Sequence, residues 1–283
     1  EFEQEACHMF NVKNAIATTS CGTGLETVLL ASGIKNKRFM VPTQTFAASV
    51  NCIIRTGNTP LIVDVDSETQ CLSLDIIKEN MTDDMGGVIM VHMSGLITPE
   101  MEEIEKYCKD NNLFLVTDDA HSYGAKLGDR FAGSFGDAGV FSFYPSKIIT
   151  TGEGGMITTN SYDVMSMAKT LRNHGGDGRL GLYSASNDRM NEISAILGLH
   201  QLKRLEDFVE KRNHISNMYR KLLDDIPEIN LLPIYNEIKN SYWNFYLILN
   251  NVNRKKFIDK MLQFGIQLGD AYNPPCHKQP VFE

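Results

Sequence analysis

The hydrophobic positions of the chain alternate between short apolar runs and longer amphipathic stretches. Short apolar runs are typical of buried strands, whereas apolar residues repeated every three or four positions are typical of helices. The predicted strands are residues 38–41, 60–65, 87–91, 113–117, 139–143 and 156–159. The predicted helices between them are residues 24–31, 45–55, 74–80, 99–111 and 162–172. Repeated strand–helix–strand units favour an α/β fold with a mostly parallel sheet flanked by helices.

The pattern changes in the last third of the chain. Residues 190–223 predict one long helix that leads out of the first domain. A strand at residues 244–249 and a helix at residues 253–264 follow, which is too little to bury a separate core. We therefore expect a large domain at residues 1–207 and a smaller C-terminal α+β domain at residues 208–283 that looks incomplete.

Composition narrows the class of protein. The chain is 42% hydrophobic and 22% charged, which is typical of a soluble globular protein. Its formal net charge of -8 argues against a nucleic-acid partner, and no apolar run reaches the roughly 18 residues of a membrane span. The six cysteines are scattered without a CxxC pair, so we expect reduced thiols in a cytoplasmic protein and no metal site.

A glycine-rich stretch, "TTSCGTGLETVLLASG" at residues 18–33, precedes an apolar helical run. Unpaired N–H groups at a helix N-terminus bind anions, and Gly22 and Thr23 would allow a phosphate to approach closely. The alternative is an ordinary turn in which Ser20 or Thr23 caps the helix. The stretch alone does not decide between them.

An acidic pair ends a predicted strand in "LFLVTDDAHSYGA", residues 113–125. A carboxylate here could hold a protonated ring nitrogen or a metal, and His121 follows closely. If the strand continues through the pair, Asp118 and Asp119 face opposite sides of the sheet. The alternative is two capping acids and a surface histidine.

A lysine follows another predicted strand in "FSFYPSKIITTGEGG", residues 141–155. Desolvation at the floor of a pocket would lower the pKa of Lys147 and make it a nucleophile, whereas most loop lysines are solvated. Ser142 lies at the end of the same strand, and Phe46 could either stack on a flat ligand or pack in the core. Together these residues suit a flat, phosphorylated aldehyde with a basic ring nitrogen.

The combined motifs resemble the pyridoxal-phosphate-dependent sugar aminotransferases of the DegT/StrS type, which have the aspartate-aminotransferase-like fold (fold type I). The resemblance rests on "TSCGTGLE", "TDDAHSYGA", "FSFYPSKIITTGEGG" and "NDRMNEISAILGLHQLKRLE", and it runs over nearly the whole chain. It implies that Lys147 forms a Schiff base with pyridoxal 5'-phosphate, that Asp118 keeps the pyridine nitrogen protonated, and that His121 lies beside the phenolic oxygen. The other implied cofactor-binding residues are Gly22, Thr23, Ser142, Phe46 and either Asn187 or Arg189.

The position of Asn187 and Arg189 implies a homodimer, because this segment of the family reaches the partner subunit's cofactor phosphate. The reaction that the resemblance implies moves an amino group from an amino acid, expected to be L-glutamate, to a keto sugar, expected to be nucleotide-linked. Some similar proteins have histidine in place of the lysine and are dehydratases, so Lys147 favours transamination. Two alternatives stay open: a keto-cyclitol or amino-aromatic precursor as the acceptor, and a non-catalytic sensor of the cofactor or of a sugar nucleotide. Asp119 stands where small residues are usual.

Overall fold

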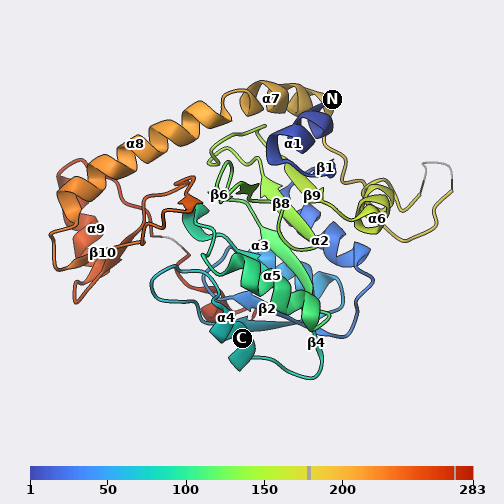
Figure 1. The fold of residues 1–283 in the computed structure, drawn as a ribbon, viewed down its shortest axis with the longest axis horizontal. Coiled ribbons are helices and arrows are strands. Elements are labelled where there is room, and N and C mark those ends of the chain that lie inside the picture. Colours follow the sequence, from blue (N-terminus) through green and yellow to red (C-terminus); the bar gives the residue numbers. More distant parts are fainter. Residues whose placement is uncertain (177–179, 271, 283) are drawn as a thin grey trace.

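A seven-stranded mixed sheet forms the centre of the molecule, with strand order β1-β9-β8-β5-β4-β2-β3 (Figure 1). The structure, a computed structural model, describes residues 1–176, 180–270 and 272–282. The strands are β1 (Asn14–Thr18), β2 (Arg38–Pro42), β3 (Thr59–Val63), β4 (Met85–Val91), β5 (Phe114–Asp118), β8 (Ala138–Ser142) and β9 (Gly155–Thr159). Strand β9 is antiparallel to β1 and β8, and the other neighbours pair in parallel. The predicted α/β fold with a mostly parallel sheet is confirmed.

Helices flank this sheet (Figure 1). They are α1 (Phe2–Phe10), α2 (Cys21–Ala31), α3 (Ala47–Arg55), α4 (Leu74–Glu79), α5 (Met101–Asp110) and α6 (Tyr162–Arg172). The five predicted helices in this part are present, with ends that shift by a few residues. The start of α2 at Cys21 rather than residue 24 matters most, because it places Gly22 and Thr23 inside the first helical turn.

Two apolar clusters pack against the sheet. Successive residues alternate between the two clusters in β1, β8 and β9, so Val140 belongs to one cluster and Phe141 to the other, whereas β2, β4 and β5 contribute to the first cluster at successive positions. The first cluster takes in α2, α3 and α5, and the second takes in α1 and residues after α6. This arrangement explains why the central strands are apolar on both faces and give continuous apolar runs in the sequence.

The single helix predicted at residues 190–223 is wrong. The chain forms α7 (Glu192–Leu202) and α8 (Leu205–Leu223) with a bend between them. Helix α7 packs on α1 so closely that a Cβ at Gly198 would lie 2.5 Å from the Phe2 ring, whereas α8 packs on Gly124 through Val209. The bend allows both helices to make these contacts. No local sequence pattern predicts the bend, because the contacting residues are far apart in the chain. The proposed domain boundary after residue 207 falls inside α8 and stays a prediction.

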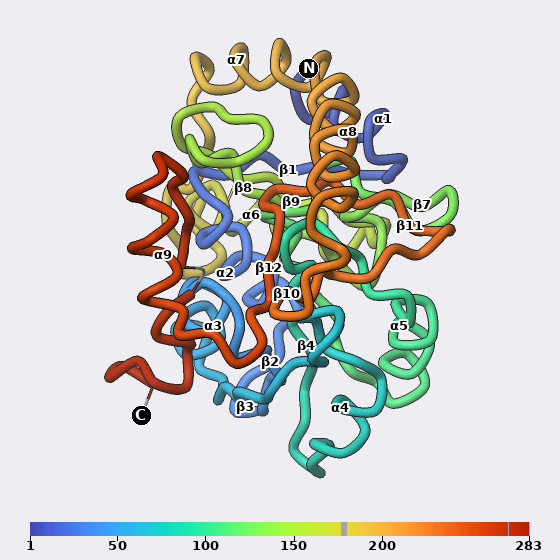
Figure 2. Tube along the Cα trace, turned by 90° about the vertical axis from the view of Figure 1, so that its left-hand side faces the viewer, coloured from blue at the N-terminus to red at the C-terminus, as the bar shows by residue number. Residues whose placement is uncertain are grey.

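The chain after α8 forms short elements and returns along that helix (Figure 2). They are β10 (Ile229–Leu231), β11 (Ile238–Lys239), β12 (Leu247–Leu249), α9 (Arg254–Gln263) and the 3-10 turn Cys276–Lys278. The strand predicted at residues 244–249 is thus shorter, because residues 241–246 form a loop docked on other elements. Strand β11 adds to the hairpin of β6 (Lys126–Leu127) and β7 (Arg130–Phe131). Over the described ranges, no helix has the length and apolar character needed to cross a bilayer.

Candidate active site

The carboxyl ends of the parallel strands meet at one edge of the sheet. The register pairs Ser142 of β8 with Gly155, which in turn pairs with Thr18 of β1. On the other side, Val140 of β8 pairs with Asp118 of β5. Residues that are more than 100 positions apart in the chain are therefore neighbours across this edge. This is the place where ligands bind in open α/β sheets.

The glycine-rich stretch forms a capped helix start. Ser20 is the N-cap of α2: its Oγ accepts the Thr23 N–H at 3.1 Å, and the Thr23 Oγ1 accepts the Ser20 N–H at 3.1 Å. The capping role and the phosphate role are compatible, because the remaining N–H groups of the first turn have no partner within the helix. A Cβ at Gly155 would lie 2.3 Å from the Ser20 carbonyl oxygen, so the glycine cluster after Lys147 permits this close approach.

Asp118 ends β5 with its carboxylate on the side of the lysine. Its Oδ2 accepts a hydrogen bond from Ser49 Oγ at 2.7 Å, and its Oδ1 accepts the Ala120 N–H at 3.1 Å. Burial raises the pKa of Asp118, and these hydrogen bonds together with the positive charge of Lys147 oppose that rise. A buried carboxylate held by two donors is suited to pair with a cationic ring nitrogen.

Asp119 faces a different set of partners, as the period of a strand requires. Its side chain is fully buried and accepts hydrogen bonds from Thr117 Oγ1 at 2.5 Å and Ser122 Oγ at 2.7 Å. A Cβ at Gly139 would lie 2.5 Å from Asp119 Oδ2, so this neighbour must be glycine. The structure thus accounts for Asp119: it ties the end of β5 to the turn that carries His121.

His92 lies next to Asp119 in the same interior. The distance from its Nε2 to Asp119 Oδ1 is 3.8 Å, and both side chains have no exposed area. Burial raises the pKa of Asp119 to about 7 and lowers the pKa of His92 to about 3. Both groups are therefore uncharged over the weakly acidic range.

The substitution Asp119→Asn should change how stability depends on pH. Because the folded pKa of Asp119 is raised to about 7, its contribution to the free energy of unfolding falls as pH rises from about 4 to 7. His92 contributes the opposite slope, because its folded pKa of about 3 lies below its usual value of about 6.5. Urea unfolding should show that the variant gains stability relative to the wild type over this interval. The exposed Asp129→Asn variant is the control and should follow the wild type. If the Asp119→Asn and wild-type curves of unfolding free energy against pH were parallel, the titration of buried Asp119 would be contradicted.

Lys147 is half-buried and lies against one aromatic ring. Its Nζ is 4.4 Å from the centroid of the Trp243 ring. Desolvation lowers the pKa of Lys147, and the negative charge of Asp118 opposes this shift. Lys147 is therefore not an ordinary solvated loop lysine, and its environment favours the neutral amine that a nucleophile requires.

His121 is buried within the same aromatic group and is not a surface histidine. Its ring stacks on Trp243 with centroids 3.8 Å apart and planes 9° apart. Its Nε2 lies 2.9 Å from the Tyr272 hydroxyl, whereas its Nδ1 has no hydrogen-bond partner among the described residues. Burial, together with the positive charge of Lys147, lowers the pKa of His121 well below its usual range. The neutral ring leaves one nitrogen free to contact a ligand.

Two further predicted residues lie at the same edge of the sheet. Phe46 follows β2 as the N-cap of α3 and is 64% exposed, so the core-packing interpretation of this residue is wrong. An exposed aromatic ring above the strand ends can stack on a planar ligand. Ser142 is buried at the end of β8, where its Oγ accepts the Tyr144 N–H at 3.4 Å.

Asn187 and Arg189 lie at the outer edge of the sheet, on a segment that pairs with Thr18 and Asn173. Both are exposed. The Arg189 guanidinium donates to the side chain of Asn173. The Asn187 side chain has no hydrogen bond to any residue that the structure describes. The structure does not bring either side chain into contact with Lys147 or Asp118.

Sequence reasoning missed several residues that shape this edge. Trp243 contacts both Lys147 and His121, Ser49 holds Asp118, and Tyr272 reaches His121. The available signal for Trp243 was that it is the only tryptophan of the chain. Within the described ranges, no group of three or more His, Cys, Asp or Glu side chains could hold a metal ion.

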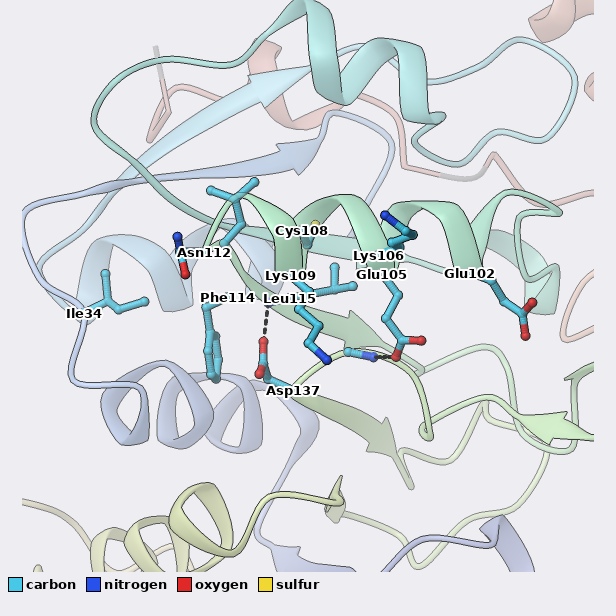
Figure 3. A pocket seen from close by; sticks show the side chains of 12 residues that line it. Ile34, Glu102, Glu105, Lys106, Cys108, Lys109, Asn112, Phe114, Leu115 and Asp137 are labelled. Carbon is cyan, nitrogen blue, oxygen red and sulfur yellow. Dashed lines mark hydrogen bonds between the residues drawn. The ribbon is translucent and has the colours of Figure 1, made fainter.

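A cavity of about 770 Å³ lies elsewhere, beside α5 and the start of β5 (Figure 3). It is at the opposite end of β5 from Asp118. Two of its three carboxylates accept backbone hydrogen bonds: Asp137 accepts the Leu115 N–H at 2.8 Å, and Glu105 accepts the Gly136 N–H at 2.7 Å. The third, Glu102, lies 4.0 Å from the Arg130 guanidinium. The cavity therefore has no part in the chemistry at the strand ends.

Comparisons with known proteins agree with this geometry. The model of the DegT/DnrJ/EryC1/StrS aminotransferase family matches residues 1–283. The chain is 35% identical over 295 residues to a GDP-perosamine synthase of Caulobacter vibrioides, covering 100% of this chain and 78% of that protein. It is 29% identical over 301 residues to a GDP-perosamine synthase of Escherichia coli O157:H7, covering 100% and 81%. A DegT DnrJ EryC1 StrS aminotransferase from Brucella abortus has a similar crystal structure, with a TM-score of 0.92, 26% identity and coverage of 99% and 77%.

Proposed function

Since the chain belongs to the DegT/DnrJ/EryC1/StrS family of pyridoxal-phosphate-dependent aminotransferases, we propose that it transfers an amino group from L-glutamate to a nucleotide-linked keto sugar. The observation that carries the proposal is the half-buried Lys147, whose ammonium is favoured by the charge of the Asp118 carboxylate and whose Nζ lies over the Trp243 ring. We further propose that it acts in the cytoplasm. The GDP-perosamine synthases and the nucleotide-sugar transaminases among its relatives support the substrate class.

The residues at the strand ends fit pyridoxal phosphate. A helix N-terminus with unpaired N–H groups suits the phosphate, and Gly22 leaves its approach open. Asp118 suits a protonated pyridine nitrogen, because its carboxylate is buried and already held by Ser49. His121 has a buried nitrogen, Nδ1, without a hydrogen bond to any residue in the described ranges, which suits the phenolic oxygen. The exposed Phe46 ring can cover one face of the pyridine.

The bound cofactor would supply an electron sink for the carbon that gives or receives the amino group. Lys147 would hold the cofactor through its ε-amine and, once released, would carry a proton to and from the carbon that bears the amino group. Asp118 keeps the ring nitrogen protonated. Ser142 and the first turn of α2 bind the phosphate and keep the ring in place. His121 fixes the orientation of the ring from the side of the phenolic oxygen.

The test is spectroscopic and uses the purified chain. Added pyridoxal phosphate should give a visible absorption band, and glutamate should convert the band to that of the pyridoxamine form. A panel of nucleotide-linked keto sugars and keto-cyclitols should then restore the first band only with the true acceptor. A folded protein that binds the cofactor but gives no half-reaction with any amino acid would overturn the proposal and favour a sensor.

We propose that the cofactor site is completed across a homodimer. Helix α7 exposes an apolar face, with Ile193 81% exposed, Ile196 56% and Leu197 42%. Exposed apolar patches of this kind mark protein interfaces. The neighbouring Asn187 side chain is exposed and has no hydrogen bond among the described residues, whereas Arg189 is held by Asn173. Asn187 is thus the better placed of the two to reach the partner subunit's cofactor phosphate.

The substitution Asn187→Ala should weaken cofactor binding by about tenfold, because one charge-assisted hydrogen bond to the phosphate is lost. Arg189→Ala serves as the comparison and should have the smaller effect on the dissociation constant. Mixing the inactive Lys147→Ala chain with the Asn187→Ala chain should give one complete site per heterodimer, measured at limiting cofactor as turnover regained above that of the Asn187→Ala chain alone. No regained turnover in a mixture that forms heterodimers would argue that each subunit binds its cofactor alone.

A further inference from the structure

Trp243 lies where the C-terminal part of the chain meets the candidate lysine. Three contacts join it to the site: the Lys147 Nζ over its ring at 4.4 Å, the His121 ring stacked on it at 3.8 Å, and its indole N–H donating to the Ser146 carbonyl at 2.8 Å. Ser146 directly precedes Lys147. The indole therefore touches both the end and the base of the lysine.

The backbone around Trp243 is clamped. The Trp243 N–H donates to the Ser94 carbonyl at 3.0 Å, and Arg212 of α8 donates to the Trp243 carbonyl at 3.0 Å and to the Tyr242 carbonyl at 2.9 Å. The Ser94 hydroxyl also donates to the Asn244 carbonyl. Such a set of contacts holds the indole in one orientation without help from a ligand.

The turn "VHMSG", residues 91–95, allows the loop before Trp243 to pack closely. Gly95 has φ 93°, and a Cβ there would lie 2.1 Å from Ser241 Oγ and 2.8 Å from the His121 carbonyl oxygen. Ser241 Oγ donates to that same carbonyl at 2.8 Å. The loop before Trp243 is thus seated against the turns that carry Ser94 and His121.

We propose, on the basis of the function proposed above, that Trp243 is a positioning residue for amino transfer, whose indole face stabilises the ammonium of free Lys147 while its N–H fixes the backbone before the lysine. Aromatic faces attract cations, and more strongly where water is excluded. A lysine that carries a proton accepts it as the amine and releases it as the ammonium, so the site must stabilise both forms. Burial favours the amine, so the aromatic face restores the ammonium.

Other charged or titratable groups also face the lysine. Asp118 on β5 favours the ammonium, whereas burial raises the pKa of the Cys21 thiol on α2 well above its usual range and leaves it uncharged. The buried neutral His121 also stacks on the indole. Asp118 acts at a distance through its charge. Trp243 is the group that contacts the Nζ directly and also supports His121.

The first test needs no cofactor and no substitution of Trp243. Because the chain has a single tryptophan, its fluorescence reports on Trp243 alone. Protonation of an amine 4.4 Å from the ring should alter the emission, so the cofactor-free protein should show a pH-dependent step. Lys147→Met should remove the step, and Lys211→Met, on the exposed side of α8, should keep it. Identical curves for the wild type and Lys147→Met would overturn the proposed contact.

The second test changes the indole. The rate at which limiting acetic anhydride labels Lys147, followed by peptide mapping as a function of pH, gives the titration midpoint of the amine. A variant that only made Lys147 easier for the reagent to reach would change the maximum labelling rate but not this midpoint. With Trp243→Leu, labelling near neutral pH should rise by about three- to tenfold through a lower midpoint, because the ammonium loses its stabilising face. Trp243→Phe, which keeps a ring face but no N–H, should lie between. An unchanged midpoint in folded Trp243→Leu would overturn the proposal.

Turnover separates this inference from the proposed function. Trp243→Leu should lower kcat at least about tenfold with little change in the KM for the amino donor, since the residue acts on the proton carrier. A wild-type protein that shows the fluorescence step but no transamination would refute the proposed function alone. Transamination with an unchanged Lys147 midpoint in Trp243→Leu would refute the role of Trp243 alone.

Discussion

Replacement of Lys147 by alanine is expected to lower turnover by at least about 10³-fold, because it removes both the amine that holds the cofactor and the group that carries the proton. Lys147→Arg should be nearly as inactive, since a guanidinium keeps the charge but does not give up its proton. The measurement is steady-state amino transfer, together with the visible band formed with pyridoxal phosphate.

The exposed Lys211, which pairs with Asp207 on α8, provides the matched control. Lys211→Ala should keep the band and the turnover. Circular dichroism should confirm that Lys147→Ala is folded. Near-wild-type turnover of Lys147→Ala would refute the assignment of the lysine, and with it the proposed mechanism.

Asp118→Asn is expected to lower turnover at least about 100-fold even when the cofactor is bound. The amide keeps the size of the side chain and can still accept from Ser49, but it has no charge to hold the proton on the pyridine nitrogen. The loss should therefore appear in kcat at saturating cofactor. The measurement is a single-turnover half-reaction with glutamate, at a cofactor concentration where the visible band is complete.

The neighbouring acid makes this experiment specific. Asp119→Asn changes the adjacent carboxylate, which is engaged by Thr117 and Ser122, and it should retain most of the half-reaction rate. Equal losses in both variants would mean that general disruption of the end of β5, and not the charge on Asp118, causes the effect. A full rate for cofactor-saturated Asp118→Asn would remove this residue from the mechanism.

Some of the site could be predicted because it depends on local rules. The alternation of side chains along a strand places Asp118 and Asp119 on different sides, and the structure gives them separate partners. The helix start after Ser20 follows from capping residues that lie close together in the sequence. Strand ends bounded by glycine and polar residues likewise marked the positions of Ser142 and Lys147.

Other features depend on contacts between distant parts of the chain. Phe46 could have been a core residue by composition, and only the surface of the fold shows that it is exposed. The bend between α7 and α8 follows from packing on Phe2 and Gly124. Trp243 reaches Lys147 through a loop held by Arg212 and Ser94, and no pattern near the lysine indicates that contact.

The α/β architecture and the kinds of residue at the strand ends could be predicted from the sequence, because both follow from the period of apolar positions and from short motifs. The tertiary structure decided which side chains meet, how far each is removed from water, and which charges oppose that burial. Those quantities set the protonation of Lys147 and His121. They arise from neighbours up to 151 positions away, as between His121 and Tyr272, so no local pattern can contain them.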